Sequence, residues 1–315
     1  MSDRPDVGAS VDLGSNSVHL LIAEITRHEL RSLVDESVFL GLGSAVDGQA
    51  HLGAARRGEL AEVLLRYAAT ARQLGANDIT FIGTEPIRRA GDAARIGADV
   101  ERVSGVPLHV LSHEEEAYLT LVGVTSGQPV KHETLVVDIG GGSSEFCAVA
   151  AGGIARAAGL RLGSNGLSMR FARHDPPTPD ELRSMTTAAD EILLDALPAE
   201  PTDIALVGGT ASNLLKVTAA GSADRELSRE RVAEALSALA ARSADDTSER
   251  FGVNPTRARL LPAGAVIVEA LMRRYGVDRV RVSEAGMREG AILVAHHAGR
   301  AWRDRVAELA HGWRR

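Results

Sequence analysis

Two short glycine-rich segments have the composition of phosphate-binding turns. The first is Asp12-Leu13-Gly14-Ser15-Asn16-Ser17, and the second is Asp138-Ile139-Gly140-Gly141-Gly142-Ser143. In each, an Asp is followed by Gly two positions later and by Ser five positions later. Glycine lets a turn bring its backbone N–H groups close to an anion, because no Cβ blocks the approach. A hairpin turn that needs a positive φ explains either segment alone, whereas the repetition favours an anion site.

Acidic residues lie at the same two turns. Asp12 and Asp138 end predicted strands, and Glu145 follows on the returning strand. Carboxylates next to a phosphate site repel the substrate unless a cation lies between them. Mg²⁺ is suited to this position, because it binds carboxylates, waters and phosphate oxygens. The simpler alternative is that each Asp only caps its own turn.

A third segment, Ser112-His113-Glu114-Glu115-Glu116-Ala117, places three carboxylates at the start of a predicted helix. Acidic residues in a first helical turn are favoured by the helix dipole, which is one explanation. The other is that one Glu activates a water molecule as a general base. The pattern alone does not say which Glu.

Two further segments could contact an anion. Arg88 follows an apolar strand and could hold a phosphate with two hydrogen bonds, although the spacing alone favours a pair of surface arginines, Arg88 and Arg89. Gly209 and Thr210 follow another apolar strand and open a predicted helix. A helix N-terminus attracts anions, because its first N–H groups have no partner within the helix.

The elements around these residues alternate between strands and helices, which predicts an α/β fold. Each glycine turn joins two apolar stretches and is predicted to form a hairpin. Further strands are expected at 30–40, 79–82, 108–111, 159–162, 204–207 and 279–282. Helices are expected at 53–74, 92–104, 114–122, from Pro179 onward, at 228–242, at 256–275 and from Glu284 onward. The repeated hairpin predicts two domains of related fold, residues 1–127 and 128–315.

Composition excludes several classes of protein. The chain has 315 residues, of which 44% are apolar, and its only cysteine, Cys147, is expected in the core. A disulfide framework and a cysteine-based zinc site are therefore excluded. A net charge of −7 with 3% aromatic residues argues against nucleic-acid binding. The polar N-terminal segment, 1–10, does not fit a signal peptide, and no apolar run is long enough for a membrane span. We therefore expect a cytoplasmic protein with no membrane partner.

Together these segments resemble the exopolyphosphatase / guanosine pentaphosphate phosphohydrolase (Ppx/GppA) family, in its short two-domain form. The resemblance rests on both glycine turns and on residues 83–90, 112–117, 175–179, 261–265 and 284–290, which span nearly the whole chain. It implies an α/β fold of two RNase H-like domains around an interdomain cleft, as in actin, Hsp70 and sugar kinases.

The resemblance also implies roles for individual residues. It identifies Glu116 as the catalytic base and Arg88 as a phosphate ligand. It associates Asp138 and Glu145 with Mg²⁺, with Mn²⁺ as an alternative, and we group Asp12 with them as a metal ligand. The expected phosphate-binding residues are Gly14, Ser15, Asn16, Ser17, Arg88, Gly140, Gly141, Gly142, Ser143, Gly209 and Thr210.

The implied activity is Mg²⁺-dependent release of terminal phosphate from inorganic polyphosphate. The alternative is hydrolysis of guanosine pentaphosphate (pppGpp) by the same residues, and a more remote one is a small-molecule kinase of the same superfamily. Family members often pair, which makes a homodimer the expected assembly. The sequence departs from the family pattern at Glu85, where a small residue is common, at His113, where glycine is usual, and in 163–167.

Overall fold

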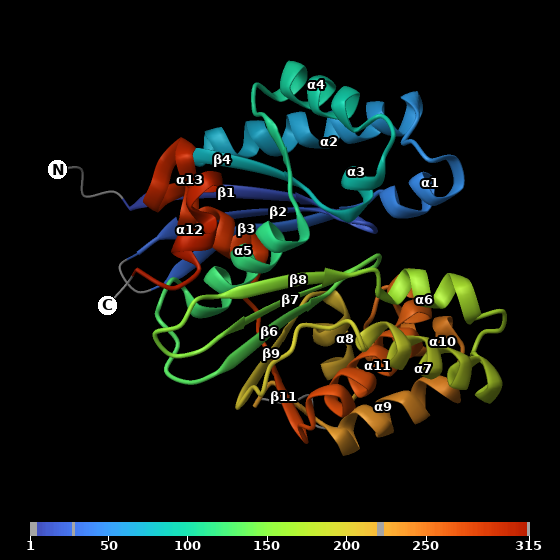
Figure 1. Ribbon diagram of the computed structural model, residues 1–315. Coiled ribbons are helices and arrows are strands. Elements are labelled where there is room, and N and C mark those ends of the chain that lie inside the picture. Colours follow the sequence, from blue (N-terminus) through green and yellow to red (C-terminus); the bar gives the residue numbers. More distant parts are fainter. Residues whose placement is uncertain (1–4, 27–28, 219–223, 314–315) are drawn as a thin grey trace. The chain divides into compact units, whose positions relative to one another are not determined.

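The computed structural model describes residues 5–26, 29–218 and 224–313, so the first four residues of the polar N-terminal segment lie outside the described residues. The chain divides into two compact units, whose elements are labelled in Figure 1. Unit 1 is Met1–Pro129 together with Ala285–Arg315, and unit 2 is Val130–Glu284. The first boundary lies close to the one expected after residue 127. Ala285–Arg315 belongs to unit 1, however, whereas the sequence analysis assigned this segment to the second domain.

Unit 1 is built on a five-stranded mixed sheet. Its strands, in the order in which they lie, are β3 (Leu30–Phe39), β2 (Ser17–Ile25), β1 (Asp6–Leu13), β4 (Ala76–Gly83) and β5 (Leu108–Val110). Strands β1, β2 and β3 are antiparallel, whereas β4 runs parallel to β1 and β5 parallel to β4. The carboxyl ends of the parallel strands therefore meet at one edge, where open α/β sheets bind their ligands.

Helices lie on both faces of this sheet. They are α1 (Leu42–Gln49), α2 (Ala54–Gln73), α3 (Glu85–Arg89), α4 (Ala93–Ser104), α5 (His113–Thr125), α12 (Met287–Ala298) and α13 (Trp302–Leu309), with a short 3₁₀ turn at Gly299–Ala301. Successive side chains of β2 point to opposite faces of the sheet, as in any pleated strand. Leu20 and Ile22 pack in the core that contains α2, whereas Leu21 and Ala23 pack with Ile292 of α12.

Glycines explain why the C-terminal segment joins unit 1. Helix α12 lies directly against α5, and a Cβ at Gly290 would collide with the carbonyl oxygen of Leu119. A Cβ at Gly123 of α5 would likewise collide with the carbonyl oxygen of Gly286. Only glycine permits so close an approach of two backbones. The motif at 284–290 therefore has a packing function that spacing alone does not reveal.

Unit 2 is built on a six-stranded mixed sheet. Its strands, in spatial order, are β10 (Glu226–Ser228), β11 (Arg279–Val282), β9 (Asp203–Val207), β6 (Thr134–Ile139), β7 (Ser144–Val149) and β8 (Arg156–Leu160). Strands β6, β9 and β11 are parallel, and β7 and β8 extend the sheet as antiparallel hairpins. Cys147 is buried in β7, where burial raises the pKa of its thiol to about 12. The cysteine is a core residue, as predicted.

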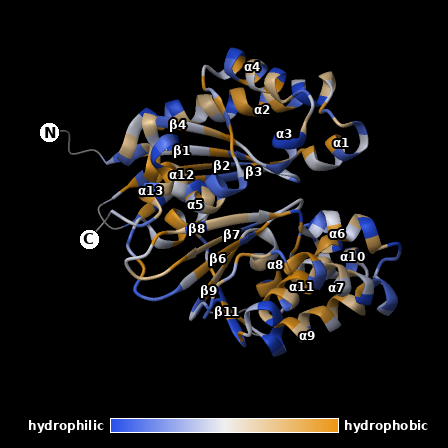
Figure 2. Cartoon of the chain, in the orientation of Figure 1, coloured by the Kyte–Doolittle hydropathy of each residue, from blue (hydrophilic) through white to orange (hydrophobic). Residues whose placement is uncertain are grey.

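The helices of unit 2 are α6 (Ser164–Phe171), α7 (Pro179–Leu193), α8 (Gly209–Val217), α9 (Arg229–Ala240), α10 (Ala244–Phe251) and α11 (Pro255–Tyr275). Helix α7 begins with the predicted capping box, because Thr178 and Glu181 bond to each other's backbone amides. Helix α11 is the apolar centre of the unit, and Figure 2 shows it coloured mainly as hydrophobic. Among the described residues, no helix is both long and apolar enough to cross a membrane.

The two sheets repeat one topology. The order β3-β2-β1-β4-β5 in unit 1 corresponds to β8-β7-β6-β9-β11 in unit 2, with the same alternation of antiparallel and parallel pairs. The α/β class with two RNase H-like domains is thereby confirmed. In each unit the glycine turn joins the first two strands of the hairpin.

Candidate functional site

The second glycine turn is held by its own ends and by helix α6. The amide of Gly140 donates to the carbonyl oxygen of Ser143 at 2.9 Å. The carbonyl oxygens of Gly140 and Gly141 accept from the amides of Ser164 and Asn165 at 3.1 and 2.9 Å. A Cβ at Gly163 would collide with the backbone of Gly141, so the start of α6 can lie this close only with glycine there. These contacts fix the carbonyl groups of the turn.

The amides of the same turn remain available for a ligand. Within the described residues, the N–H groups of Gly141, Gly142 and Ser143 donate to no protein acceptor. Successive backbone amides without acceptors form a concave donor set that suits an anion. Ser143 is buried, whereas Gly141 and Gly142 are partly exposed. The turn can therefore surround a phosphate oxygen with several donors.

Two predicted metal ligands face each other beside this turn. Asp138 on β6 and Glu145 on β7 are direct partners in the antiparallel register, so both side chains lie on one face of the sheet. Like charges placed directly opposite each other are destabilising unless a cation lies between them. A Cβ at Gly208, whose φ is +94°, would lie 2.6 Å from Oδ1 of Asp138. Glycine at 208 thus leaves room for the carboxylate of Asp138. The carboxylate oxygens of Asp138 and Glu145 are ligands of the kind that a hard divalent cation prefers.

Helix α8 adds its N-terminus to the same edge of unit 2. It begins at Gly209, directly after β9, and β9 is the parallel neighbour of the β6 strand that carries Asp138. A Cβ at Gly264 of α11 would lie 2.5 Å from Cγ2 of Thr210, so glycine in α11 lets the start of α8 pack closely. Unit 2 therefore brings Gly209 and Thr210 to the strand ends that carry Asp138 and the second turn.

Arg257 is a residue that the sequence analysis missed. Its guanidinium Nη1 would lie 3.6 Å from a Cβ at Gly209, at the start of α8. The side chain is half-buried, and burial lowers the pKa of its guanidinium. In the part of the chain that the structure describes, Arg257 forms no hydrogen bond or ion pair. An uncompensated cation beside a helix N-terminus is an arrangement that favours an anion.

The first glycine turn repeats this architecture in unit 1. The amide of Gly14 donates to the carbonyl oxygen of Ser17 at 3.1 Å, as Gly140 does to Ser143. The carbonyl oxygens of Ser15 and Asn16 accept from backbone amides of the segment 40–43 at 2.8 to 3.0 Å. The amides of Ser15 and Asn16 have no acceptor among residues 5–26, 29–218 and 224–313. Both turns thus present amides in the same way.

The acidic position of the first turn differs from its counterpart. Asp12 on β1 is the register partner of His19 on β2, where the second hairpin pairs Asp138 with Glu145. Arg288 of α12 supplies a positive charge near Asp12. Burial opposes the charge of Arg288, but its hydrogen bond to Asp35 and the charges of Glu289, Asp35 and Asp12 raise the pKa of its guanidinium. Unit 1 therefore pairs its carboxylate with His19 where unit 2 pairs two carboxylates, and it adds Arg288 near Asp12.

The two adjacent arginines of α3 have separate partners. Nη1 of Arg88 donates to the Glu116 carboxylate and to the carbonyl oxygen of Leu111, the latter at 2.6 Å. Nη2 of Arg88 lies 3.0 Å from Nδ1 of His113. Arg89 donates to the buried Glu85 carboxylate and, at 2.8 Å, to Asp47. Arg88 and Glu116, which the sequence analysis singled out separately, are thus brought together in unit 1.

The three carboxylates at the start of helix α5 have different surroundings. Glu114 is exposed, Glu115 completes a capping box with Ser112, and Glu116 is buried. Arg303 of α13 donates to Glu115 from Nη2 at 2.9 Å. Burial opposes the charge of Glu115, but the hydrogen bonds from Arg303 and from the Ser112 amide lower the pKa of its carboxyl. Of the three, only Glu116 is both buried and paired with Arg88, which distinguishes it as the functional candidate.

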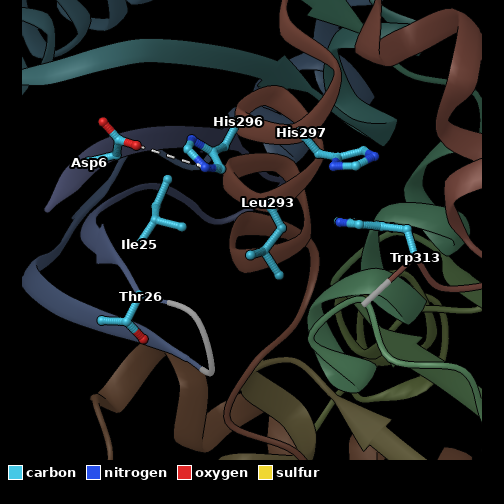
Figure 3. A pocket seen from close by; sticks show the side chains of 7 residues that line it. All are labelled: Asp6, Ile25, Thr26, Leu293, His296, His297 and Trp313. Atoms are coloured by element: carbon cyan, nitrogen blue, oxygen red, sulfur yellow. Dashed lines mark ion pairs between the residues drawn. The ribbon is translucent and has the colours of Figure 1, made fainter. Parts of the chain in front are cut away.

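A cavity of about 400 Å³ lies elsewhere in unit 1. Figure 3 shows that it is lined by Asp6, Ile25, Thr26, Leu293, His296, His297 and Trp313. His297 stacks on Trp313 with ring centroids 4.8 Å apart, and Nε2 of His296 lies 4.0 Å from Oδ2 of Asp6. None of the predicted site residues lines this cavity, so it is separate from both glycine turns.

Comparison with known proteins adds a family and several relatives. The model of the Ppx/GppA phosphatase family matches residues 21–298. Exopolyphosphatase 1 of Mycobacterium leprae (strain TN) is 27% identical over 301 residues, which cover 90% of this chain and 87% of that protein. Exopolyphosphatase 1 of Mycobacterium tuberculosis (strain H37Rv) is 26% identical over 296 residues, with coverage of 90% and 86%.

A solved structure shows the same similarity in three dimensions. The crystal structure of the Aquifex aeolicus member of the Ppx/GppA protein family superposes with a TM-score of 0.82 at 25% sequence identity. The match covers 94% of this chain and 99% of that one. The fold and the sequence of this chain are therefore similar to those of one group of proteins over nearly their whole length.

Proposed function

This chain belongs to the Ppx/GppA phosphatase family, and we propose that it is an exopolyphosphatase that releases terminal phosphate from inorganic polyphosphate. Relatives named exopolyphosphatase, which match over 90% of the chain, support this choice over the alternatives. Hydrolysis of pppGpp would use the same residues and is the alternative that the experiment below must separate. The cytoplasmic location inferred from composition and the homodimer implied by the family resemblance both stay predictions.

The second glycine turn is the observation that most supports a phosphate substrate. Its three amides without acceptors lie beside the facing carboxylates of Asp138 and Glu145. Amides bind phosphate oxygens, and the carboxylates bind the cation that a polyanionic substrate requires. Arg257, with no counter-ion in the described part of the chain, adds positive charge beside Gly209. The combination suits a chain of phosphates better than a neutral ligand.

In the proposed reaction Glu116 is the general base. The oxygen of a water molecule bonds to the terminal phosphorus, and one of its protons passes to Glu116. The bond from this phosphorus to the bridging oxygen breaks, and the shortened polyphosphate leaves with that oxygen and the electron pair of the bond. Arg88 fixes the orientation of the Glu116 carboxylate before the substrate arrives. Most of the rate enhancement in phosphoryl transfer comes from positioning and charge stabilisation, which the turn amides and Arg88 would supply.

A divalent cation, Mg²⁺ or Mn²⁺, would be held by Asp138 and Glu145 and would offset the negative charge of the phosphoryl group. The space that the missing Cβ of Gly208 leaves beside Oδ1 of Asp138 is consistent with a cation ligand at this position. In unit 1, Asp12 is the corresponding candidate ligand, and Arg288 already supplies positive charge near it. Glu116 and the first turn belong to unit 1, whereas Asp138, Glu145 and the second turn belong to unit 2.

The proposed function is tested by measuring phosphate release with Mg²⁺, separately from polyphosphate of defined length and from pppGpp. No acceptor molecule is added, so that hydrolysis is distinguished from phosphotransfer. Release from polyphosphate supports the proposal, and omission of the cation should abolish it. Release from pppGpp alone would make pppGpp the substrate and would leave the proposed roles of the site residues unchanged. Release from neither would contradict the proposed function and would make a kinase activity the next one to test.

A further inference from the structure

Glu85 is a buried carboxylate beside the first glycine turn, and none of the roles proposed above uses it. Its exposed fraction is 5%. Thr84, directly before it, donates from Oγ1 to the carbonyl oxygen of Leu13 at 3.1 Å. This bond ties the start of α3 to the end of β1. Glu85 is thereby fixed next to the turn that begins after Leu13.

The two oxygens of Glu85 have different partners. Oε1 accepts from Nε of Arg89, and Oε2 accepts from the hydroxyl of Ser15 at 3.3 Å. A carboxylate removed from water costs several kcal/mol unless it is paired, and Arg89 provides the pair. Burial opposes the charge of Arg89, but its hydrogen bonds to Glu85 and Asp47 raise the pKa of its guanidinium. Arg89 is thus engaged by protein carboxylates.

Ser15 is held from its other side by helix α1. The amide of Gly43 donates to the carbonyl oxygen of Ser15 at 2.8 Å, and a Cβ at Gly43 would lie 3.0 Å from Cβ of Ser15. Ser15 therefore lies between Gly43 and Glu85. A serine hydroxyl has one proton, so a hydroxyl that donates to Glu85 cannot donate to a phosphate oxygen at the same time.

We propose that Glu85 is a positioning residue of the first phosphate turn. It holds Ser15 through the hydroxyl proton, so that the turn meets a phosphate with the amides of Ser15 and Asn16 and not with the Ser15 side chain. The inference rests on the proposed function, because it assumes that this turn binds phosphate. It assigns a role to the carboxylate at a position where the family commonly has a small residue.

A double-mutant cycle in the phosphate-release assay tests the proposal. Ser15→Ala and Glu85→Ala should each raise the KM for polyphosphate about tenfold and change kcat less than threefold, because the turn holds phosphate in the ground state and the transition state alike. The double variant should be no worse than either single one. Asp47→Asn is the matched control, because Asp47 contacts Arg89 but not Ser15, and its KM should stay within twofold of wild type.

Two kinetic results would overturn the proposal. Effects that multiply in the double variant would mean that Ser15 contacts the substrate independently of Glu85. KM values within twofold of wild type in both single variants would mean that the bond does not position the turn. A purely structural role would lower the amount of active enzyme and leave KM unchanged. If Glu85→Ala fails to fold, Ser15→Ala keeps the test open, because it removes the same hydrogen bond from the other side and leaves Glu85 paired with Arg89.

Amide hydrogen exchange of the peptide covering 14–17, without substrate, separates this inference from the proposed function. Exchange should become faster in Ser15→Ala and in Glu85→Ala but not in Asp47→Asn. If wild type released phosphate from no substrate, the proposed function would fail, and the exchange result would still report whether Glu85 positions the turn. Unchanged exchange in both variants would contradict the positioning role whatever the enzyme hydrolyses.

Discussion

The guanidinium of Arg88 donates to the carboxylate of Glu116, a residue that is only 6% exposed. The same Nη1 atom donates to the carbonyl oxygen of Leu111, two residues before α5 begins, so Arg88 is tied to the backbone that leads into the helix. Helix α5 is in turn capped by Ser112 and Glu115. The orientation of Glu116 is therefore set by bonds that do not involve the substrate, as a preorganised base requires.

Filling the space between Gly208 and Asp138 should weaken cation binding specifically. Gly208→Ala would place a Cβ 2.6 Å from Oδ1 of Asp138, so we expect the concentration of Mg²⁺ for half-maximal phosphate release to rise about 10–100-fold. Gly252→Ala is the control, because Gly252 also has a positive φ, +63°, but no atom within 4 Å of a Cβ there. Both variants carry backbone strain of about 1–3 kcal/mol. An equal Mg²⁺ requirement in the two variants would contradict a cation at Asp138.

Replacing Arg257 should weaken the binding of polyphosphate without lowering thermal stability. Arg257→Met removes a half-buried charge that has no counter-ion in the described part of the chain, so thermal stability should stay the same or rise. The KM for polyphosphate should rise about tenfold, because charge-assisted bonds to phosphate are lost. Arg259→Met is the control, since Arg259 is exposed and pairs with Asp175 at 3.3 Å. Loss of stability without a change in KM would make Arg257 a structural residue.

Two glycine-to-alanine changes should shift the free energy of unfolding in opposite directions. One lies at the contact between α5 and α12, and the other lies on an open face of α4. Gly290→Ala inserts a methyl group against the backbone of Leu119 and should lower the free energy of unfolding by about 1–3 kcal/mol. Gly97→Ala lies within α4 with nothing within 4 Å of the new Cβ, and it should raise this free energy by about 0.5–1 kcal/mol. Chemical denaturation measures both. A neutral Gly290→Ala would mean that the two helices can separate without cost.

The pairing of Glu115 with Arg303 predicts a pH-dependent contribution to stability. The pKa of Glu115 is lowered from its ordinary value of 4.5, so its contribution is present above that pH and is lost as pH falls through the folded-state pKa. Glu115→Gln keeps an acceptor for the Ser112 amide and removes the charge. Near neutral pH it should lower the melting temperature by about 2–4 °C. The difference from wild type should shrink on acidification below 4.5, and a constant difference would exclude the charge as its cause.

The sequence predicted best the features that depend on local pattern. The long helices α2 and α11 begin and end within two residues of their predicted bounds, because each has a sustained apolar period and glycine just before or just after it. The capping box before α7 was also predicted and confirmed. The short helices α1, α3 and α6 were not expected, since a segment of 5 to 8 residues is too short for a detectable period.

Features that depend on long-range contacts could not be predicted. The assignment of Ala285–Arg315 to unit 1 depends on backbone contacts of Gly290 with α5, which no local pattern encodes. Arg257 lies within a helix and has no distinctive neighbours in sequence, so only its position beside Gly209 reveals it. Conversely, Asp138 and Glu145 were singled out from their spacing, and the register of β6 and β7 places them opposite each other. Their roles in catalysis stay predictions until the variants are measured.

The most direct test of the account compares two neighbouring carboxylates of α5. Glu116→Gln removes the proposed base but keeps its shape, whereas Glu114→Gln changes an exposed residue of the same helix turn. With polyphosphate and Mg²⁺, Glu116→Gln should still bind substrate and should lose turnover by about 10²–10⁴-fold, and Glu114→Gln should match wild type. Turnover of Glu116→Gln near the wild-type value would contradict the role of Glu116 as the general base.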